Sequence, residues 1–149
     1  MPGGSTNRQG STNLRCMKSA EDVESYLLRT GLPYETISEG IWLVQMVGSR
    51  LAVSIAGSVV AFRMKVLEVP NTGREELFRT LLQLNTTEMV HGAFGLEADA
   101  VVIVHALELE NLDFNELQAV LDDMSMAASK HHPTLSRYIE ARPETVPHA

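Results

Sequence analysis

Three extended segments separated by Gly-Ser pairs constrain the fold most strongly. Residues 41–47 (IWLVQMV), 50–56 (RLAVSIA) and 59–69 (VVAFRMKVLEV) are rich in β-branched and aromatic residues, which favour strands. Gly48-Ser49 and Gly57-Ser58 separate them, and a two-residue loop that begins with glycine is typical of a type II′ hairpin turn. The sequence therefore predicts three consecutive antiparallel strands.

Side-chain alternation differs between two of the predicted strands. The third segment alternates apolar and basic residues: Phe62, Arg63, Met64, Lys65 and Val66. This period of two predicts one face against the core and one against water. Two further strands, residues 90–96 and 100–109, flank a turn at residues 97–99, and residues 100–106 are apolar on both faces apart from His105. An antiparallel strand with one solvated face should alternate, so this run predicts that both of its faces are covered.

Capping signals place a helix before the strands. Ser19 followed three residues later by Asp22 is a capping-box pattern, which predicts the start of a helix. Gly31 then suits a left-handed C-terminal residue, and Pro33 prevents continuation of the helix.

Two later helices are predicted in the same way. Thr72 and Glu75 form a second capping box at the start of the middle helix, and Asp113 with Glu116 forms a third. The last helix is expected to end before Pro133, with the adjacent His131 and His132 as favourable cations at its C-terminus.

The predicted order is helix, three strands, helix, two strands, helix. This pattern indicates an α+β fold in which helices pack on an antiparallel sheet. The domain is expected to span residues 19–140, between a disordered tail of residues 1–18, which is poor in apolar residues, and a C-terminal tail of residues 141–149.

Composition narrows the classes of function. The tail of residues 1–18 carries three basic side chains and no acid, so residues 19–149 hold 9 basic and 19 acidic side chains, a net charge of −10. An acidic domain is a poor binder of phosphate backbones, so nucleic acid is an unlikely partner. A lone cysteine, Cys16, fits a reducing compartment, and no apolar run is long enough to span a membrane, so we expect a cytoplasmic protein without a membrane role.

The ionisable residues predict neither a catalytic site nor a metal or cofactor site. His131 and His132 are adjacent and would point about 100° apart on a helix. His91 and His105 lie on different predicted strands and have no third ligand in the pattern. Asp122 and Asp123 are expected on the solvated face of the last helix. We therefore expect a protein that is not an enzyme and that needs no cofactor.

Unexplained apolar surface indicates binding instead. The middle helix carries more than the roughly 100° of apolar surface that a helix on a monomer needs. Either it lies deep in its own core or part of it contacts a second chain; the interface residues would be Phe78, Leu81, Leu82 and Leu84, with Leu81 as an outer position. The apolar strand runs and a methionine off the main helical stripe give candidate partner-binding residues: Ile41, Leu43, Val102, Val104 and Met126.

Four short motifs resemble the YbjN-domain family, which shares its fold with class I type III secretion chaperones. They are Leu84-Asn85, Phe94-Gly95-Leu96, Leu107-x-Leu109-x-x-Leu112-Asp113 and His132-Pro133-x-Leu135. The resemblance covers residues 19–140. It implies a bacterial homodimer that binds a partly unfolded protein segment on apolar patches, partly by strand addition. The closing motif is closer to YbjN, for which the alternative is a sensory or regulatory domain that binds a signalling protein or nucleic acid.

Overall fold

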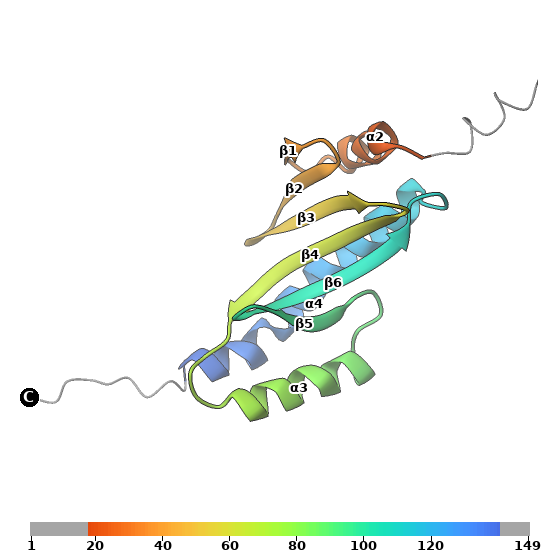
Figure 1. The fold of residues 1–149 in the computed structure, drawn as a ribbon. Coiled ribbons are helices and arrows are strands. Elements are labelled where there is room, and N and C mark those ends of the chain that lie inside the picture. Colours follow the sequence, from red (N-terminus) through yellow and green to blue (C-terminus); the bar gives the residue numbers. More distant parts are fainter. Residues whose placement is uncertain (1–17, 141–149) are drawn as a thin grey trace, which may run out of the picture.

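A computed structural model describes residues 18–140, which form a six-stranded antiparallel sheet with three helices (Figure 1). The predicted tails lie outside this range, apart from Lys18. In chain order the elements are α2 (Ala20–Thr30), β1 (Tyr34–Ser38), β2 (Ile41–Met46), β3 (Ser49–Ala56), β4 (Val59–Glu68), α3 (Arg74–Thr87), β5 (Ala93–Glu97), β6 (Ala100–Glu108) and α4 (Phe114–Glu140).

The strand order in the sheet is β1-β2-β3-β4-β6-β5, and every neighbouring pair is antiparallel. Hairpins join β1 to β2, β2 to β3, β3 to β4 and β5 to β6, whereas β4 pairs with β6 only after the chain has passed through α3 and β5. The predicted α+β class is confirmed. The predicted number of strands before the middle helix is wrong by one, because Tyr34–Ser38 forms a separate edge strand.

The two Gly-Ser pairs differ in their turns. The β3–β4 loop is Gly57-Ser58, and the positive φ of Gly57 (62°) in the first position agrees with the predicted type II′ turn. The β2–β3 loop is instead Val47-Gly48, because Met46 pairs with Ser49. Gly48 (φ 74°) is then the second loop residue, so the prediction of a type II′ turn with glycine first is wrong there.

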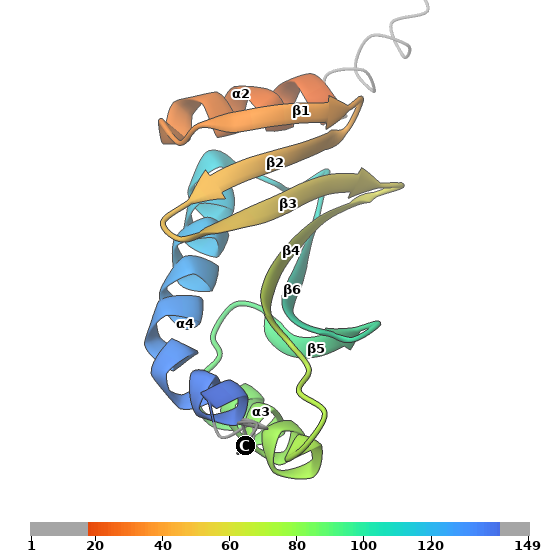
Figure 2. The same ribbon diagram turned by 90° about the vertical axis from the view of Figure 1, so that its left-hand side faces the viewer.

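The core lies between the sheet and the helices. In Figure 2, α4 runs along the left of the sheet. Helix α2 lies near the upper end of α4, and α3 lies near its lower end. Phe62 and Met64 face this side and are buried, as their alternation predicted. Val66 is only half-buried, because a bulge between Lys65 and Leu67 shifts the register and turns Leu67 into the core. The helices contribute further buried side chains: Val23, Leu27, Leu77, Leu117, Leu121 and Met124.

The helix starts agree with the capping signals in two cases of three. The Ser19 N–H donates to Asp22 Oδ2 at 2.8 Å, and the Glu116 N–H donates to Asp113 Oδ1 at 2.7 Å. The box predicted from Thr72 is wrong. The middle helix begins at Arg74 after Gly73, whose φ of 71° is left-handed and provides no side-chain cap.

The last helix does not end at Pro133, so that prediction is also wrong. It continues to Glu140, with Leu135 fully buried and the hydroxyls of Tyr138 and Thr80 2.6 Å apart. Because the helix continues, His131 is not a terminal cation. It is 5% exposed and lies edge-on to the Phe94 ring, with ring centroids 6.0 Å apart.

Candidate protein-binding surfaces

One face of the sheet is free of helices along the described chain, on the right in Figure 2. The strand register assigns residues to it. Trp42 and Val44 are buried against the helices, so Ile41 and Leu43 lie on the opposite face. Leu43 pairs with Ala52, Ala52 with Arg63, and Arg63 with Val104, which forms one cross-strand row on that face. Four predicted partner-binding residues, Ile41, Leu43, Val102 and Val104, therefore share it.

These four side chains are covered to different degrees. Ile41 is 39% exposed, Leu43 and Val104 are half-buried, and Val102 is only 5% exposed. The expectation that both faces of β6 would be covered is thus met for Val102, but by neighbouring side chains rather than by another helix. No described element lies over this face.

The open face contains two neighbouring hollows. One, of about 440 Å³, is lined by Leu43, Arg50, Ala52, Arg63, Lys65, Glu97, Ala98, Ala100 and Val102. The other, of about 260 Å³, is lined by Pro33, Tyr34, Glu35, Leu43, Gln45 and Arg50. They share Leu43 and Arg50, and together their lining includes residues of all six strands. The two hollows are here called the sheet groove.

Two of the three basic side chains that line the sheet groove, Arg63 and Lys65, have acidic partners, whereas Arg50 has none among the described residues. Arg63 Nε lies 2.9 Å from Glu97 Oε2, and the Lys65 ammonium contacts the Glu68 carboxylate. All four side chains are more than half exposed, so each pair contributes little to stability. The residues that line the groove include three basic and two acidic side chains, a net charge of +1, despite the acidity of the domain.

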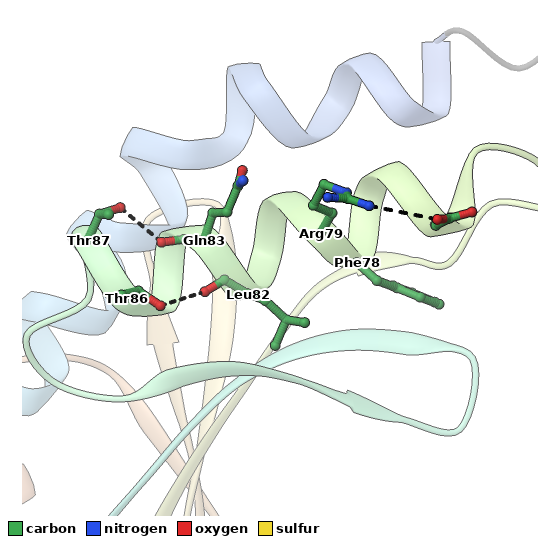
Figure 3. A pocket seen from close by; sticks show the side chains of 7 residues that line it. Phe78, Arg79, Leu82, Gln83, Thr86 and Thr87 are labelled. Atoms are coloured by element: carbon green, nitrogen blue, oxygen red, sulfur yellow. Dashed lines mark hydrogen bonds and ion pairs between the residues drawn. The ribbon is translucent and has the colours of Figure 1, made fainter.

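A second groove lies on the outer face of α3 (Figure 3). It has a volume of about 630 Å³ and is lined by Glu75, Phe78, Arg79, Leu82, Gln83, Thr86 and Thr87. Leu82 is 66% exposed, whereas Phe78 and Leu84 are half-buried against the core. Leu81 is 4% exposed and belongs to the core beside Leu77. Choosing Leu81 as an outer position was therefore wrong; Leu82 is the outer position of this stripe.

Met126 lies apart from the other candidate partner-binding residues. As expected, it is outside the core, with 68% of its surface exposed, but it lies on α4 and thus on the helical side of the sheet. It lines a small hollow of about 180 Å³ beside Val90, which is 84% exposed. The candidate partner-binding residues therefore form two surfaces, not one.

The ionisable residues gather where the α3–β5 connection meets α4. His91 Nδ1 contacts the Asp123 carboxylate, so Asp123 is not simply a solvated side chain as expected. The rings of His91 and His105 meet edge to face with centroids 5.5 Å apart, and the Gly92 N–H donates to His105 Nδ1 at 3.0 Å. Within residues 18–140, no group of three or more His, Cys, Asp or Glu side chains converges as metal ligands would.

The Lys130 ammonium lies 2.6 Å from the Glu88 carboxylate and lowers its pKa. This contact ties the end of α3 to α4 at the same junction. No helix between residues 18 and 140 is long and apolar enough to cross a membrane.

Solved structures with the same fold come from secretion and regulatory proteins. A chain of the heterodimeric ExoU-SpcU complex from the type III secretion system of Pseudomonas aeruginosa superposes with a TM-score of 0.61 at 18% identity, covering 73% of this chain and 93% of that one. The Yersinia pestis type III secretion chaperone SycH, in complex with a fragment of YscM2, gives 0.56 at 19%, covering 74% and 97%. YbjN from E. coli gives 0.60 at 11%, covering 78% and 92%. Identities this low establish a shared fold.

The sequence itself matches the CesT_Tir_1 family over residues 16–141, which is most of the chain. No curated protein sequence gives a significant match. The family match spans the four motifs of the sequence analysis and agrees with the structural neighbours, so the resemblance inferred from those motifs is confirmed. The chain belongs to the CesT_Tir_1 family of type III secretion chaperones.

Proposed function

We propose that the chain is a non-enzymatic, cytoplasmic, chaperone-like module that binds a segment of a partner protein through apolar surfaces of a homodimer. The observation that supports this most directly is the helix-free face of the sheet, where the apolar side chains of Ile41, Leu43 and Val104 have no helix over them. Its structural neighbours include proteins solved as complexes with a second protein, among them ExoU-SpcU and SycH with YscM2.

The sheet groove suits an apolar segment better than a charged ligand. Two of its three basic side chains, Arg63 and Lys65, already have acidic partners, so a charged ligand would have to compete there with Glu97 and Glu68. Only Arg50 lines the groove without an acidic partner among the described residues. Aliphatic side chains of a partner would gain roughly 25 cal/mol for each Å² of apolar surface that they remove from water. Binding would therefore depend mainly on burial and would tolerate variation in the sequence of the bound segment.

The outer face of α3 is the proposed dimer interface. Phe78 and Leu82, one turn apart, present apolar surface in the α3 groove, and Leu84 extends the stripe toward the end of the helix. A second copy would bury the same patch on both subunits, as a two-fold axis requires. Leu81 supports this surface from within the core.

The test is capture of a partner from cells of the native organism by the tagged chain. We expect Leu43→Glu to lower recovery of the partner at least tenfold, because Leu43 lines both hollows of the groove and the substitution places a carboxylate there. Val47→Glu is the matched control, since Val47 is 93% exposed in the β2–β3 loop and lines neither hollow. Equal recovery by the two variants, with both folded, would reject the sheet groove as the binding surface.

A sensory or regulatory role is the second candidate, because YbjN, a structural neighbour, is provisionally described as a transcription regulator. The identity of the captured partner separates the two roles. An exported protein would favour the chaperone role, and a regulator or a nucleic acid would favour the alternative.

A further inference from the structure

The two edges of the sheet are not equivalent. The strand order leaves β1 and β5 as edge strands, and an edge strand presents unpaired backbone N–H and C=O groups to which another strand can add. Along β5, the backbone N–H and C=O groups of successive residues point alternately toward β6 and away from it. Glu97 and Ala100 flank the two-residue turn and pair directly, so Glu97, Gly95 and Ala93 direct their backbone groups toward β6. Phe94 and Leu96 therefore direct theirs outward.

The outward groups of Phe94 are already occupied by a side chain. Its N–H donates to Asn85 Oδ1 at 2.7 Å, and Asn85 Nδ2 donates to its C=O at 3.0 Å. The planar amide of Asn85 thus supplies one acceptor and one donor, as a residue of an added strand would. Asn85 lies in the last turn of α3, which packs beside β5, so the helix holds this amide in place.

Only Leu96 keeps outward backbone groups on β5. One residue offers too short a ladder for stable pairing, so an incoming strand would have to displace Asn85. The side chain of Leu96 is 54% exposed and would favour such pairing if the rest of the edge were free. The contact also joins two motifs of the sequence analysis, Leu84-Asn85 and Phe94-Gly95-Leu96.

We propose that Asn85 closes the β5 edge against strand addition by a second copy of this chain. Without it, the β5 strands of two copies would pair antiparallel about a two-fold axis, because the same edge would be available on both. This pairing is separate from the proposed contact through α3. The role of Asn85 does not depend on the proposed function, because it concerns only the chain and its own copies.

The first test compares Asn85→Ala with Asn115→Ala. Alanine favours helix, so the substitution at position 85 removes both hydrogen bonds without weakening α3 locally. Asn115 is an exposed asparagine on α4, outside the α3 groove, and serves as the matched control. In sedimentation velocity, Asn85→Ala should form species with about twice the mass of the wild-type species or more, whereas Asn115→Ala should match the wild type. A wild-type profile for a folded Asn85→Ala would overturn the proposal.

A second variant separates edge pairing from unfolding. Leu96→Pro removes the remaining outward N–H of β5, and proline is tolerated on an edge strand where its nitrogen faces away from the sheet. Asn85→Ala combined with Leu96→Pro should return to the wild-type mass. If the double variant still associates, the association has another cause and the proposal fails.

Amide hydrogen exchange of the wild type tests the same idea without any substitution. The Phe94 amide should exchange at least about tenfold more slowly than the Leu96 amide, because only the former has a partner. Equal, fast exchange of both would show that Asn85 does not close the edge. This result decides the question even if Asn85→Ala does not fold.

Discussion

At the scale of single residues, His105 is restricted to one protonation state by its surroundings. Its Nδ1 accepts the Gly92 N–H, so the proton of the neutral ring is on Nε2, which is buried and has no hydrogen-bond partner within residues 18–140. A second proton would have to bind to Nδ1. That nitrogen could then no longer accept the Gly92 N–H, and two N–H groups would point at each other. Burial lowers the pKa of His105, and the nearby His91 lowers it further. The ionisable side chains around this junction are His91 and Glu88 on the connection and Asp123, Lys130 and His131 on α4.

This arrangement predicts a loss of stability in acid. In the unfolded chain His105 has a pKa of about 6.5, and in the folded chain the pKa is lower. The unfolded state therefore binds the proton more readily, so this contribution to the free energy of unfolding decreases as pH falls below about 6.5 and is constant above it. His105→Asn keeps an acceptor near Gly92 but cannot titrate. It should lose less stability between about pH 7.5 and pH 5 than the wild type does.

Urea unfolding at the two pH values measures the difference. His132→Asn is the control, because His132 is exposed on α4 and its loss should leave the wild-type pH dependence unchanged. If His105→Asn and the wild type lose the same stability on acidification, the burial of His105 is not responsible.

At the scale of secondary-structure elements, α4 continues through a proline because tertiary contacts outweigh the local cost. Pro133 removes one intrahelical hydrogen bond and disfavours the helix by about 3 kcal/mol. Beyond it, Leu135 is fully buried, and the Tyr138 hydroxyl meets Thr80 on α3. The residues after Pro133 thus form a second link between α4 and α3, in addition to the contact of Lys130 with Glu88.

Removing the buried side chain in this segment should be costly. Leu135→Ala should lower the free energy of unfolding by about 2–5 kcal/mol, because it leaves a cavity in the core. Ile139→Ala, four residues on and 40% exposed, should cost much less. Denaturant unfolding of the two variants measures both values, and equal costs would mean that the helix after Pro133 does not pack as described.

Local patterns predicted those elements whose signals lie within a few residues. Ser19 with Asp22 gave the start of α2, and the alternation around Phe62 gave the inner face of β4. β1 was not recognised as a separate strand, because its last four residues are exposed and show no apolar alternation. The end of α4 could not be predicted locally, since it depends on contacts of Leu135 and Tyr138 with distant parts of the chain.

At the scale of the whole molecule, the candidate binding surface depends on a pairing that local patterns do not encode. The apolar runs identified Ile41, Leu43, Val102 and Val104 as unexplained. Their common face follows only from the sheet order, in which β4 pairs with β6 after an intervening helix and strand. For the same reason the sequence could not assign Met126 to the opposite side of the sheet.

The proposed dimer predicts opposite results for two neighbouring leucines. Leu82→Asp should give a folded monomer, because Leu82 is exposed in the α3 groove and a charge there would oppose a second copy. Leu81→Asp should unfold the chain, since burying a carboxylate costs several kcal/mol and total stability is typically about 5–15 kcal/mol.

Light scattering for mass and circular dichroism for folding test both variants. A wild-type chain that is monomeric at micromolar concentration would contradict the dimer without affecting the assignment of Leu81 to the core.

The apolar centre of the sheet groove predicts that a captured partner will resist salt. Raising the salt from 0.15 M to 1 M shortens the Debye length from about 8 Å to about 3 Å, which weakens exposed ion pairs, whereas apolar burial is not weakened. Arg63 and Lys65 are already paired within the chain, so Arg50 is the one basic side chain lining the groove that has no acidic partner among the described residues. Recovery of the partner after a 1 M sodium chloride wash should therefore fall by less than about twofold. A steep loss with salt, especially of co-purifying nucleic acid, would contradict apolar binding and favour the regulatory alternative.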